Sequence, residues 1–377
     1  MNHENIMNQQ IIIVGGSIAG LSTGIFLQNK GIDSIVIEED KEIGKPLQCS
    51  GLISEDTFKE LNKIVDLEKI NEINTANFYF DNKFAFSIKT KHSKAILIDR
   101  VSLDKNLAKK YMESKGKLII NHRINSEELL SLKNSIVVGA DGFSSIVAKT
   151  FQFPEIPKNK YVKCLQYVVK GKHSKNDEVE IFFSKKYFPG FIAWFIPIDE
   201  QFCKIGCGIS LNYNFDLRRN LRILMNFYNF NENDIVEVNG GIIPLKIRKI
   251  SAKKFESNYV FLVGDAAGHV KPLSGGGIFF AHKCGQILAN CIANSISKKI
   301  RDEVINEYEK LWRKEFLNDL QNYEFVKMIF DSLPYNIILN SIKLLKLDEF
   351  ISNYGHMDRL SSIFKGEHIA THIRKLL

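Results

Sequence analysis

Long apolar runs are missing from this sequence of 377 residues. No segment approaches the roughly 20 consecutive apolar residues that a membrane-spanning helix requires. The polar opening stretch, MNHENIMNQQ, lacks the apolar core of a signal peptide. We therefore expect a cytoplasmic protein that is not integral to a membrane. With 45% hydrophobic and 25% charged residues, the composition is that of an ordinary globular protein, and the length is sufficient for two domains.

Cysteine is scarce and shows no metal-binding pattern. The sequence contains no CxxC, and no cysteine has a histidine at metal-ligand spacing, so we predict no metal. Most of the cysteines are expected to be buried thiols, with the exception of Cys49, which lies beside a glycine. The six cysteines are Cys49, Cys164, Cys203, Cys207, Cys284 and Cys291.

Concentrated positive charge is also missing. The net charge is +8, but the cationic residues are scattered and do not alternate with aromatic residues, so we predict no nucleic-acid partner. A basic surface of this kind favours solubility or contact with anionic lipid. The last ten residues, HIATHIRKLL, are basic and amphipathic. They leave two alternatives: packing against the protein, which we favour, or peripheral contact with the inner face of a membrane.

A glycine turn lies between a strand and a helix near the start of the chain, in IIIVGGSIAGLSTGIFLQNKGIDSIVIEED (residues 11–40). The apolar run of residues 11–14 is typical of a strand buried on both faces of a parallel sheet. An acid, Glu38, ends the second strand at about the 20-residue distance expected of a dinucleotide-binding unit. Ser17 replaces the usual second glycine, and its hydroxyl is suited to a phosphate. The residues expected to contact the dinucleotide are Gly15, Gly16, Ser17, Ala19, Gly20, Glu38 and Glu39.

Two further strands run into glycine-rich connections. The first is VVGADGFSSIVAK (residues 137–149), and the second is YVFLVGDAAGHVKPLSGGGIFFAHKCG (residues 259–285). Three consecutive glycines, at 275–277, cost chain entropy, which indicates that the backbone is exposed there for a purpose. We expect all three connections to converge on one cofactor. The residues expected to bind it from these two connections are Ala140, Asp141, Gly142, Gly264, Asp265, Pro272, Gly275, Gly276, Gly277 and Ile278.

This arrangement resembles the flavoprotein family of p-hydroxybenzoate hydroxylase, and the resemblance implies FAD as the cofactor. It also implies that Asp265 holds the ribityl chain of FAD and that Arg100, in IDRVSLDKNLAKK, contacts FAD. The helix that follows the three glycines would point at the N1–C2=O edge of the flavin. A helix N-terminus at that edge favours the negative charge of the reduced ring.

Four more stretches narrow the resemblance to the archaeal digeranylgeranylglycerophospholipid reductases, within the geranylgeranyl reductase family. They are IGKPLQCSGLIS (43–54), KPLSGGGI (271–278), YEKLWRKEF (308–316) and YGHMDRLSS (354–362). The resemblance implies an FAD-dependent reductase that saturates C=C bonds of geranylgeranyl chains in ether-lipid precursors or prenyl diphosphates. It also implies that Cys49, Ser50 and Gly51 lie near the flavin.

The PxxYxWxFP motif of that family corresponds to PGFIAWFIP, residues 189–197. Trp194 is retained, whereas isoleucines replace the tyrosine and the phenylalanine, which makes the pocket more aliphatic. We therefore expect substrate contacts from Pro189, Ile192, Trp194, Ile196 and Pro197.

Reduction of an unpolarised alkene requires a hydride on one face and a proton on the other, and an aromatic ring would stabilise a partly cationic carbon between them. This makes Cys49 the candidate proton donor and Trp194 the candidate aromatic residue. The alternatives are a packing role for Cys49 and a core position for Trp194. Of two histidines near the glycine turn, His282 is expected to be structural and His269 to lie on a solvent-facing loop.

Two other functions stay open on the same scaffold. One is an FAD-dependent monooxygenase, which would need a polar pocket. The other is a non-catalytic flavin-containing lipid-binding protein, which would be consistent with the altered motif. No second dinucleotide fingerprint exists in the sequence. The electron donor is therefore either transiently bound NADPH or a ferredoxin-like protein.

The predicted fold is α/β: a Rossmann-type FAD-binding domain is interleaved with an antiparallel-sheet substrate domain, and helices follow at the C-terminus. Short aromatic and β-branched runs such as VEIFFS and FIAWFIPI indicate the antiparallel strands. The expected boundaries are 1–62, 94–152 and 252–298 for the FAD-binding domain, 63–93 and 153–251 for the substrate domain, and 299–377 for the C-terminal helices.

Overall fold

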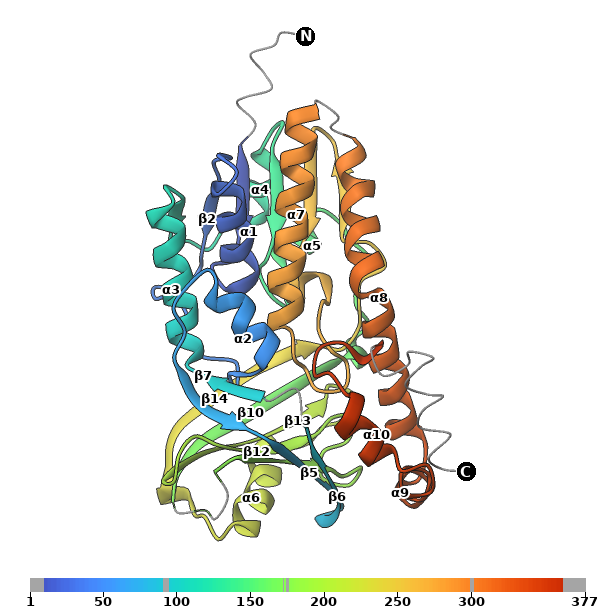
Figure 1. The fold of residues 1–377 in the computed structure, drawn as a ribbon. Coiled ribbons are helices and arrows are strands. Elements are labelled where there is room, and N and C mark those ends of the chain that lie inside the picture. Colours follow the sequence, from blue (N-terminus) through green and yellow to red (C-terminus); the bar gives the residue numbers. More distant parts are fainter. Residues whose placement is uncertain (1–9, 91–94, 172, 174–175, 299–301, 362–377) are drawn as a thin grey trace.

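The computed structural model describes residues 10–90, 95–171, 173, 176–298 and 302–361. The basic segment 368–377 lies outside this range. Two large sheets form the two ends of the molecule, and long helices connect them along one side (Figure 1). Among the described residues, no helix is both long enough and apolar enough to cross a membrane.

A six-stranded sheet forms the upper part of the molecule in Figure 1, and all its neighbouring strands are parallel except β15 and β16. Its strands, in spatial order, are β15 (Ala252–Phe255), β16 (Asn258–Leu262), β9 (Ile136–Gly139), β1 (Ile11–Val14), β2 (Ile35–Ile37) and β8 (Lys117–Ile119).

Side chains of this sheet alternate between two apolar layers, because successive residues of a strand point to opposite faces. Ile11 and Ile13 of β1 pack with α1 (Ile18–Gln28), α3 (Arg100–Glu113) and the C-terminal helices. Ile12 and Val14 pack on the other face with α4 (Ser126–Ser131) and α5 (Ile146–Thr150). The prediction of a strand buried on both faces is confirmed, and so is the α/β fold class.

A seven-stranded sheet forms the lower part of the molecule and is antiparallel except for the pair β5–β11. One of its faces packs on α6 (Leu217–Phe227), and the other face is turned toward the upper sheet (Figure 1). Its strands, in spatial order, are β14 (Ile235–Pro244), β10 (Tyr161–Lys170), β13 (Phe202–Ser210), β12 (Ala193–Pro197), β11 (Glu178–Phe183), β5 (Thr75–Phe80) and β6 (Lys83–Lys89).

A small antiparallel sheet also contributes to the fold, with β7 (Ala95–Ile98) between β3 (Leu52–Ser54) and β4 (Lys69–Ile73). Helix α2 (Glu55–Asn62) follows β3 directly, and the Ser54 hydroxyl caps it by accepting from the Thr57 backbone N–H. The predicted domain boundaries stay a prediction.

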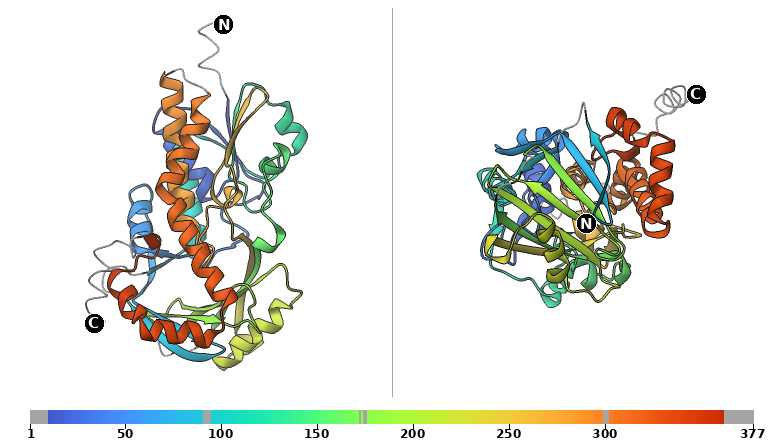
Figure 2. Two further views of the ribbon diagram at one scale, coloured as in Figure 1. Left: turned by 90° about the vertical axis from the view of Figure 1, so that its right-hand side faces the viewer. Right: turned by 90° about the horizontal axis from the view of Figure 1, so that it is seen from below.

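Two long helices connect the two ends of the molecule. α7 (Ile278–Lys298) begins at the three glycines, and α8 (Glu303–Ser332) runs beside it toward the lower sheet (Figure 2). Tyr308, Trp312 and Phe316 recur at four-residue spacing and are almost fully buried, which makes this stripe the contact face of α8. The chain continues through α9 (Tyr335–Leu344) and α10 (Leu347–Tyr354), and residues 355–361 then return to the glycine turn before α7.

Candidate functional site

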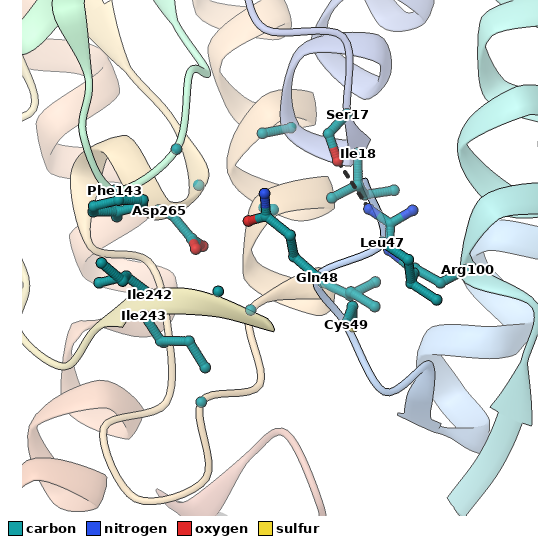
Figure 3. A pocket seen from close by; sticks show the side chains of 18 of the residues that line it. Ser17, Ile18, Leu47, Gln48, Cys49, Arg100, Phe143, Ile242, Ile243 and Asp265 are labelled. Atoms are coloured by element: carbon teal, nitrogen blue, oxygen red, sulfur yellow. Dashed lines mark hydrogen bonds between the residues drawn. The ribbon is translucent and has the colours of Figure 1, made fainter. Parts of the chain in front are cut away.

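A cavity of about 960 Å³ lies between the two large sheets. It collects residues from the ends of β1, β9 and β16 on one side and from the seven-stranded sheet on the other. The predicted convergence of the three strand-to-glycine connections is therefore confirmed. Figure 3 shows Ser17 and Arg100 on one side, Phe143 and Asp265 on the other, and Gln48 projecting into the space between them.

Most of the predicted site residues line this cavity. Five do not: Gly20, Gly51, Pro272, Pro189 and Pro197. Those that do are Gly15, Gly16, Ser17, Ala19, Glu38, Glu39, Cys49, Ser50, Arg100, Ala140, Asp141, Gly142, Ile192, Trp194, Ile196, Gly264, Asp265, Gly275, Gly276, Gly277 and Ile278.

The turn after β1 requires glycine at its first position. Gly15 has φ of +108°, and a Cβ atom there would lie 2.3 Å from the carbonyl oxygen of Ala140. The next backbone N–H, of Gly16, donates to the Glu38 carboxylate at 2.6 Å. Burial raises the pKa of Glu38, while hydrogen bonds from the Asp40 and Gly16 backbone act in the opposite direction. The acid thus lies against the glycine turn, as the dinucleotide-binding pattern predicts.

Arg100 is a buried cation that lines the cavity. Its guanidinium is 7% exposed, lies 2.5 Å from Asp104 and donates to the Ser17 hydroxyl at 2.9 Å. Its Nε has no hydrogen-bond partner among the described residues. A buried donor without an acceptor is costly, so this atom is available for an anionic oxygen.

Asp265 lies across the cavity, in the short turn that follows β16. Burial raises the pKa of its carboxyl group to about 6, and the charge of Arg100 opposes that rise. A carboxylate in this setting gains stability from a hydroxyl group that donates to it. The ribityl chain of FAD carries such groups, so the environment of Asp265 fits its predicted role.

We predict that Asp265→Asn stabilises the protein without flavin and weakens FAD binding. Because the folded-state pKa lies above the ordinary 3.8, the stability that Asp265 contributes is fully present below pH 4 and is lost as the pH rises through about 6. At pH 7 the charged carboxylate destabilises the fold by up to about 3 kcal/mol, and Asn removes this cost.

Thermal unfolding of flavin-free wild type and variant, measured from pH 4 to 8, tests this. The variant should melt a few degrees higher at pH 7, and the two curves should converge near pH 4. The variant should bind FAD about tenfold more weakly. A variant that melts lower than wild type at pH 7 would contradict the prediction.

Cys49 is the one cysteine that is only partly buried, and the other five are buried, as predicted. Its sulfur accepts from the Gly51 backbone N–H at 3.4 Å. The neighbouring Ser50 carbonyl accepts from Lys204 Nζ at 2.6 Å. Burial lowers the pKa of Lys204, whereas the charge of Cys49 acts to raise it. Cys49 also interacts electrostatically with Arg100, so its thiol lies within the field of two buried cations.

Trp194 lies on the cavity face of the seven-stranded sheet and is partly exposed to the cavity. Ile196 on β12 and Ile192 just before that strand also line the cavity, and they are 4% and 8% exposed. Pro189 and Pro197 are buried and do not reach the cavity. The two positions where isoleucine replaces the motif residues are therefore aliphatic and border the cavity beside the Trp194 indole.

Sequence reasoning missed an ion pair beside the three glycines. Lys271 Nζ lies 3.0 Å from Asp358 Oδ1, and both side chains are about 5% exposed. The Lys271 backbone N–H donates to the Gly276 carbonyl, and the Gly275 N–H donates to the Lys271 carbonyl. The signal that could have found Asp358 is the segment YGHMDRLSS, which the family resemblance singled out without assigning it a partner.

One histidine prediction is wrong and the other is confirmed. His269 was expected on a solvent-facing loop, but it is fully buried against Trp312 of α8. Burial lowers its pKa to about 3. His282 is structural, as predicted: it is buried in α7, and its Nδ1 lies 2.9 Å from the Ser22 hydroxyl.

The sequence matches the family model described as "FAD binding domain" over residues 8–81 and 123–316. The chain belongs to this FAD-binding family. It binds FAD, and the described residues fit that cofactor, because the cavity combines a glycine turn, an unpartnered arginine donor and a buried acid.

Relatives of the FAD-binding chain include proteins from archaea. A "digeranylgeranylglycerophospholipid reductase 2" of Methanothermobacter thermautotrophicus is 26% identical over 95% of this chain and 94% of that protein. An "uncharacterized protein" of Methanocaldococcus jannaschii is 29% identical over 95% of this chain and 94% of its own length. The predicted resemblance to the archaeal reductases is confirmed.

The fold is also that of a solved structure, a "geranylgeranyl bacteriochlorophyll reductase-like" protein of Thermoplasma acidophilum. The TM-score is 0.78 with 18% sequence identity, and the match covers 98% of this chain and 99% of that one. At this identity the likeness establishes the architecture of the FAD-binding chain.

Proposed function

We propose that the protein is an FAD-dependent reductase that saturates C=C bonds of geranylgeranyl chains in lipid precursors. The observation that carries the proposal is the aliphatic sheet face around Trp194, which borders the same cavity as Asp265 and Cys49. An isoprenoid chain is apolar along its length, so burial against isoleucine side chains would drive its binding. The archaeal relatives are named for reductases of such lipids, which supports the same substrate class.

Reduced FAD, when bound, supplies the hydride, and the chain's own residues do the rest. The aliphatic face holds the alkene and excludes water. The Trp194 ring faces a carbon that becomes partly cationic and stabilises it. The Cys49 thiol donates its proton to one alkene carbon while the other receives the hydride, so that two hydrogens are added in total. The sulfur that gives up the proton lies near the buried cations Lys204 and Arg100.

Ile192 and Ile196 argue against a monooxygenase, because they make the cavity wall aliphatic at the two altered positions of the motif. The replacement of the motif tyrosine and phenylalanine by Ile192 and Ile196 favours a second candidate: a lipid-binding flavoprotein without turnover. We propose either NADPH or a ferredoxin-like protein as the electron donor. A cytoplasmic location and peripheral contact with a membrane are also part of the proposal.

An anaerobic single-turnover experiment tests the proposed function. The holoenzyme is reduced with dithionite, mixed with a geranylgeranyl lipid, and followed by flavin absorbance and by product mass. Reoxidation of the flavin together with a mass gain of two hydrogens per turnover is the expected result. Flavin that stays reduced while unchanged lipid is bound would support the non-catalytic candidate and refute the reductase.

We predict that Cys49→Ala retains FAD but reduces the alkene about 100-fold more slowly, because it lacks the proton donor. Flavin content and the rate of reoxidation after lipid addition are the measurements. Cys49→Ser keeps a weaker acid in the same place, so its rate of alkene reduction should lie between those of wild type and Cys49→Ala. Cys284→Ala is the matched control, since that thiol is buried in α7 outside the cavity. Unchanged turnover in Cys49→Ala would remove Cys49 from the mechanism.

A further inference from the structure

Two amide side chains and an indole form a row across the cavity face of the seven-stranded sheet. Asn239 of β14 is in register with Gln166 of β10, and Gln166 is in register with Gly206 of β13. Gly206 is in register with Trp194 of β12. Residues directly opposite each other on neighbouring strands lie on the same face, so these positions form one line across four strands.

The glycine in this row is required by the tryptophan. A Cβ atom on Gly206 would lie 2.3 Å from the indole ring of Trp194, so no other residue leaves room for it. The indole therefore lies across β13, and its Nε1 donates to Gln166 Oε1 at 2.9 Å. Since this bond uses the carbonyl oxygen of the Gln166 amide, the NH₂ group is what Gln166 can offer to a ligand.

Asn239 continues the row with a donor that has no partner among the described residues. Its side chain is 7% exposed, and Nδ2 has no hydrogen-bond partner in the described part of the chain. Gln166 is 5% exposed, and both residues line the cavity. A buried amide donor without an acceptor costs free energy, so Asn239 Nδ2 at the wall of a binding cavity, beside the Gln166 amide, indicates a ligand acceptor.

The charge of the row selects the kind of acceptor. Asn239, Gln166 and Trp194 are all neutral. Lys204 lies two residues before Gly206 on the same strand, but its ammonium group donates to the Ser50 carbonyl at 2.6 Å. A diphosphate buried here would lack the paired cations that a buried anion requires. An ether, hydroxyl or carbonyl oxygen needs only the N–H donors that the row provides.

We propose that Asn239 and Gln166 form a subsite for an uncharged oxygen atom of the lipid substrate. The proposal rests on the proposed function, because it assumes that a lipid occupies the cavity. The subsite anchors the polar end of the lipid chain by its oxygen, while Ile192 and Ile196 hold the hydrocarbon. Gln166 has a second role, since it also positions the Trp194 indole.

Equilibrium binding of three probes to the oxidised holoenzyme tests the subsite. The probes are geranylgeranylglycerol, an oxygen-free C20 polyprene hydrocarbon and geranylgeranyl diphosphate, all dispersed in detergent. Trp194 and Trp312 are the two tryptophans of the chain, so in a Trp312→Phe background the fluorescence of Trp194 reports binding beside the row. Asn239→Leu keeps the size of the side chain and removes its donors. Ile196→Leu is the matched apolar control in the same cavity.

Asn239→Leu is expected to weaken binding of geranylgeranylglycerol about fivefold and to leave the hydrocarbon unaffected. Ile196→Leu should change the affinity for both probes by the same factor. Gln166→Leu should weaken the binding of geranylgeranylglycerol. It should also alter the fluorescence emission of Trp194 in the lipid-free holoenzyme, whereas Asn239→Leu should leave that emission unchanged.

Three outcomes would overturn the subsite. In the first, Asn239→Leu weakens binding of the hydrocarbon as much as binding of geranylgeranylglycerol. In the second, it weakens binding of the diphosphate more than binding of the other two probes. In the third, it lowers flavin content, which would make a flavin carbonyl the oxygen that the row binds. If the wild-type holoenzyme binds all three probes and reduces them without dependence on Asn239, the subsite fails while the proposed function stands. If it binds none of them, both fail.

Discussion

Replacing Arg100 with methionine is expected to yield a folded protein that binds FAD about 100-fold more weakly. The guanidinium is buried beside Asp104 and Ser17, and its Nε is a buried donor with no partner among the described residues. Methionine has a similar length but offers neither charge nor donors, so an anionic oxygen of FAD loses its partner. In this variant, the Asp104 carboxyl group loses the guanidinium that pairs with it.

Asp104 is also the basis of the matched control. Burial raises the pKa of Asp104 even beside Arg100, so without the guanidinium this carboxyl group takes up a proton instead of remaining as a buried anion. Arg100→Met should therefore still fold. Asp104→Asn keeps the cation in place and should retain FAD within about tenfold of wild type. Arg100→Lys keeps the positive charge but not the planar guanidinium group, so its affinity for FAD should lie between those of Asp104→Asn and Arg100→Met.

Flavin titration of the deflavinated proteins, with circular dichroism as the check on folding, distinguishes these outcomes. Stoichiometric flavin in purified Arg100→Met would show that the arginine is structural. Equal loss in Arg100→Met and Asp104→Asn would show that the ion pair, and not the cation, is what the cofactor site needs.

The sequence pattern predicts the cofactor-binding half of the site, because the residues of each glycine turn lie close together in the sequence. The strand at 11–14, Gly15 and Glu38 occupy one βαβ unit, and hydrophobic periodicity with glycine spacing specifies such a unit. The three strand-to-glycine connections converge since their strands are parallel neighbours, β16–β9–β1, whose carboxyl ends must lie at one edge.

Residues whose roles depend on distant segments could not be predicted in the same way. Asn239 and Gln166 look like ordinary strand residues until the pairing of β14 with β10 brings them together. The glycine-rich stretch before His269 predicts a surface position, because such stretches are usually exposed loops. The residue that covers it, Trp312, comes from α8, a helix whose position only the tertiary packing determines.

Removing the carboxylate of Asp358 is expected to cost about 3–5 kcal/mol of unfolding free energy and to lower the melting temperature by about 10 °C. The pair with Lys271 is buried on both sides, and Asp358 also accepts from the Ser54 and Thr57 hydroxyls at the start of α2. Burial alone would raise the pKa of Asp358, but Lys271 and the two hydroxyls hold it below the ordinary value. The stability from this carboxylate is therefore present above about pH 4 and is lost as the pH falls further.

The same change should disturb the cofactor, because Lys271 braces the glycine turn through its backbone and its ammonium group also donates to the Met357 carbonyl at 3.0 Å. In Asp358→Ala the ammonium group is a buried cation without its counterion, so the turn must open to water. Flavin fluorescence rises when FAD leaves the protein, and in Asp358→Ala this rise should occur at a lower temperature than in wild type.

The double variant Lys271→Met with Asp358→Leu separates charge from packing. It replaces the buried pair by apolar side chains of similar size, and such replacements of buried pairs are often neutral or stabilising. It should therefore recover most of the stability that Asp358→Ala loses. Glu232→Ala, at the exposed pair with Arg222, is the control and should change the free energy of unfolding by less than about 1 kcal/mol. If the double variant melts as low as Asp358→Ala, the ion pair is not what holds the C-terminal segment against the glycine turn. The Ser54 and Thr57 hydrogen bonds to Asp358 would then be the interaction that does.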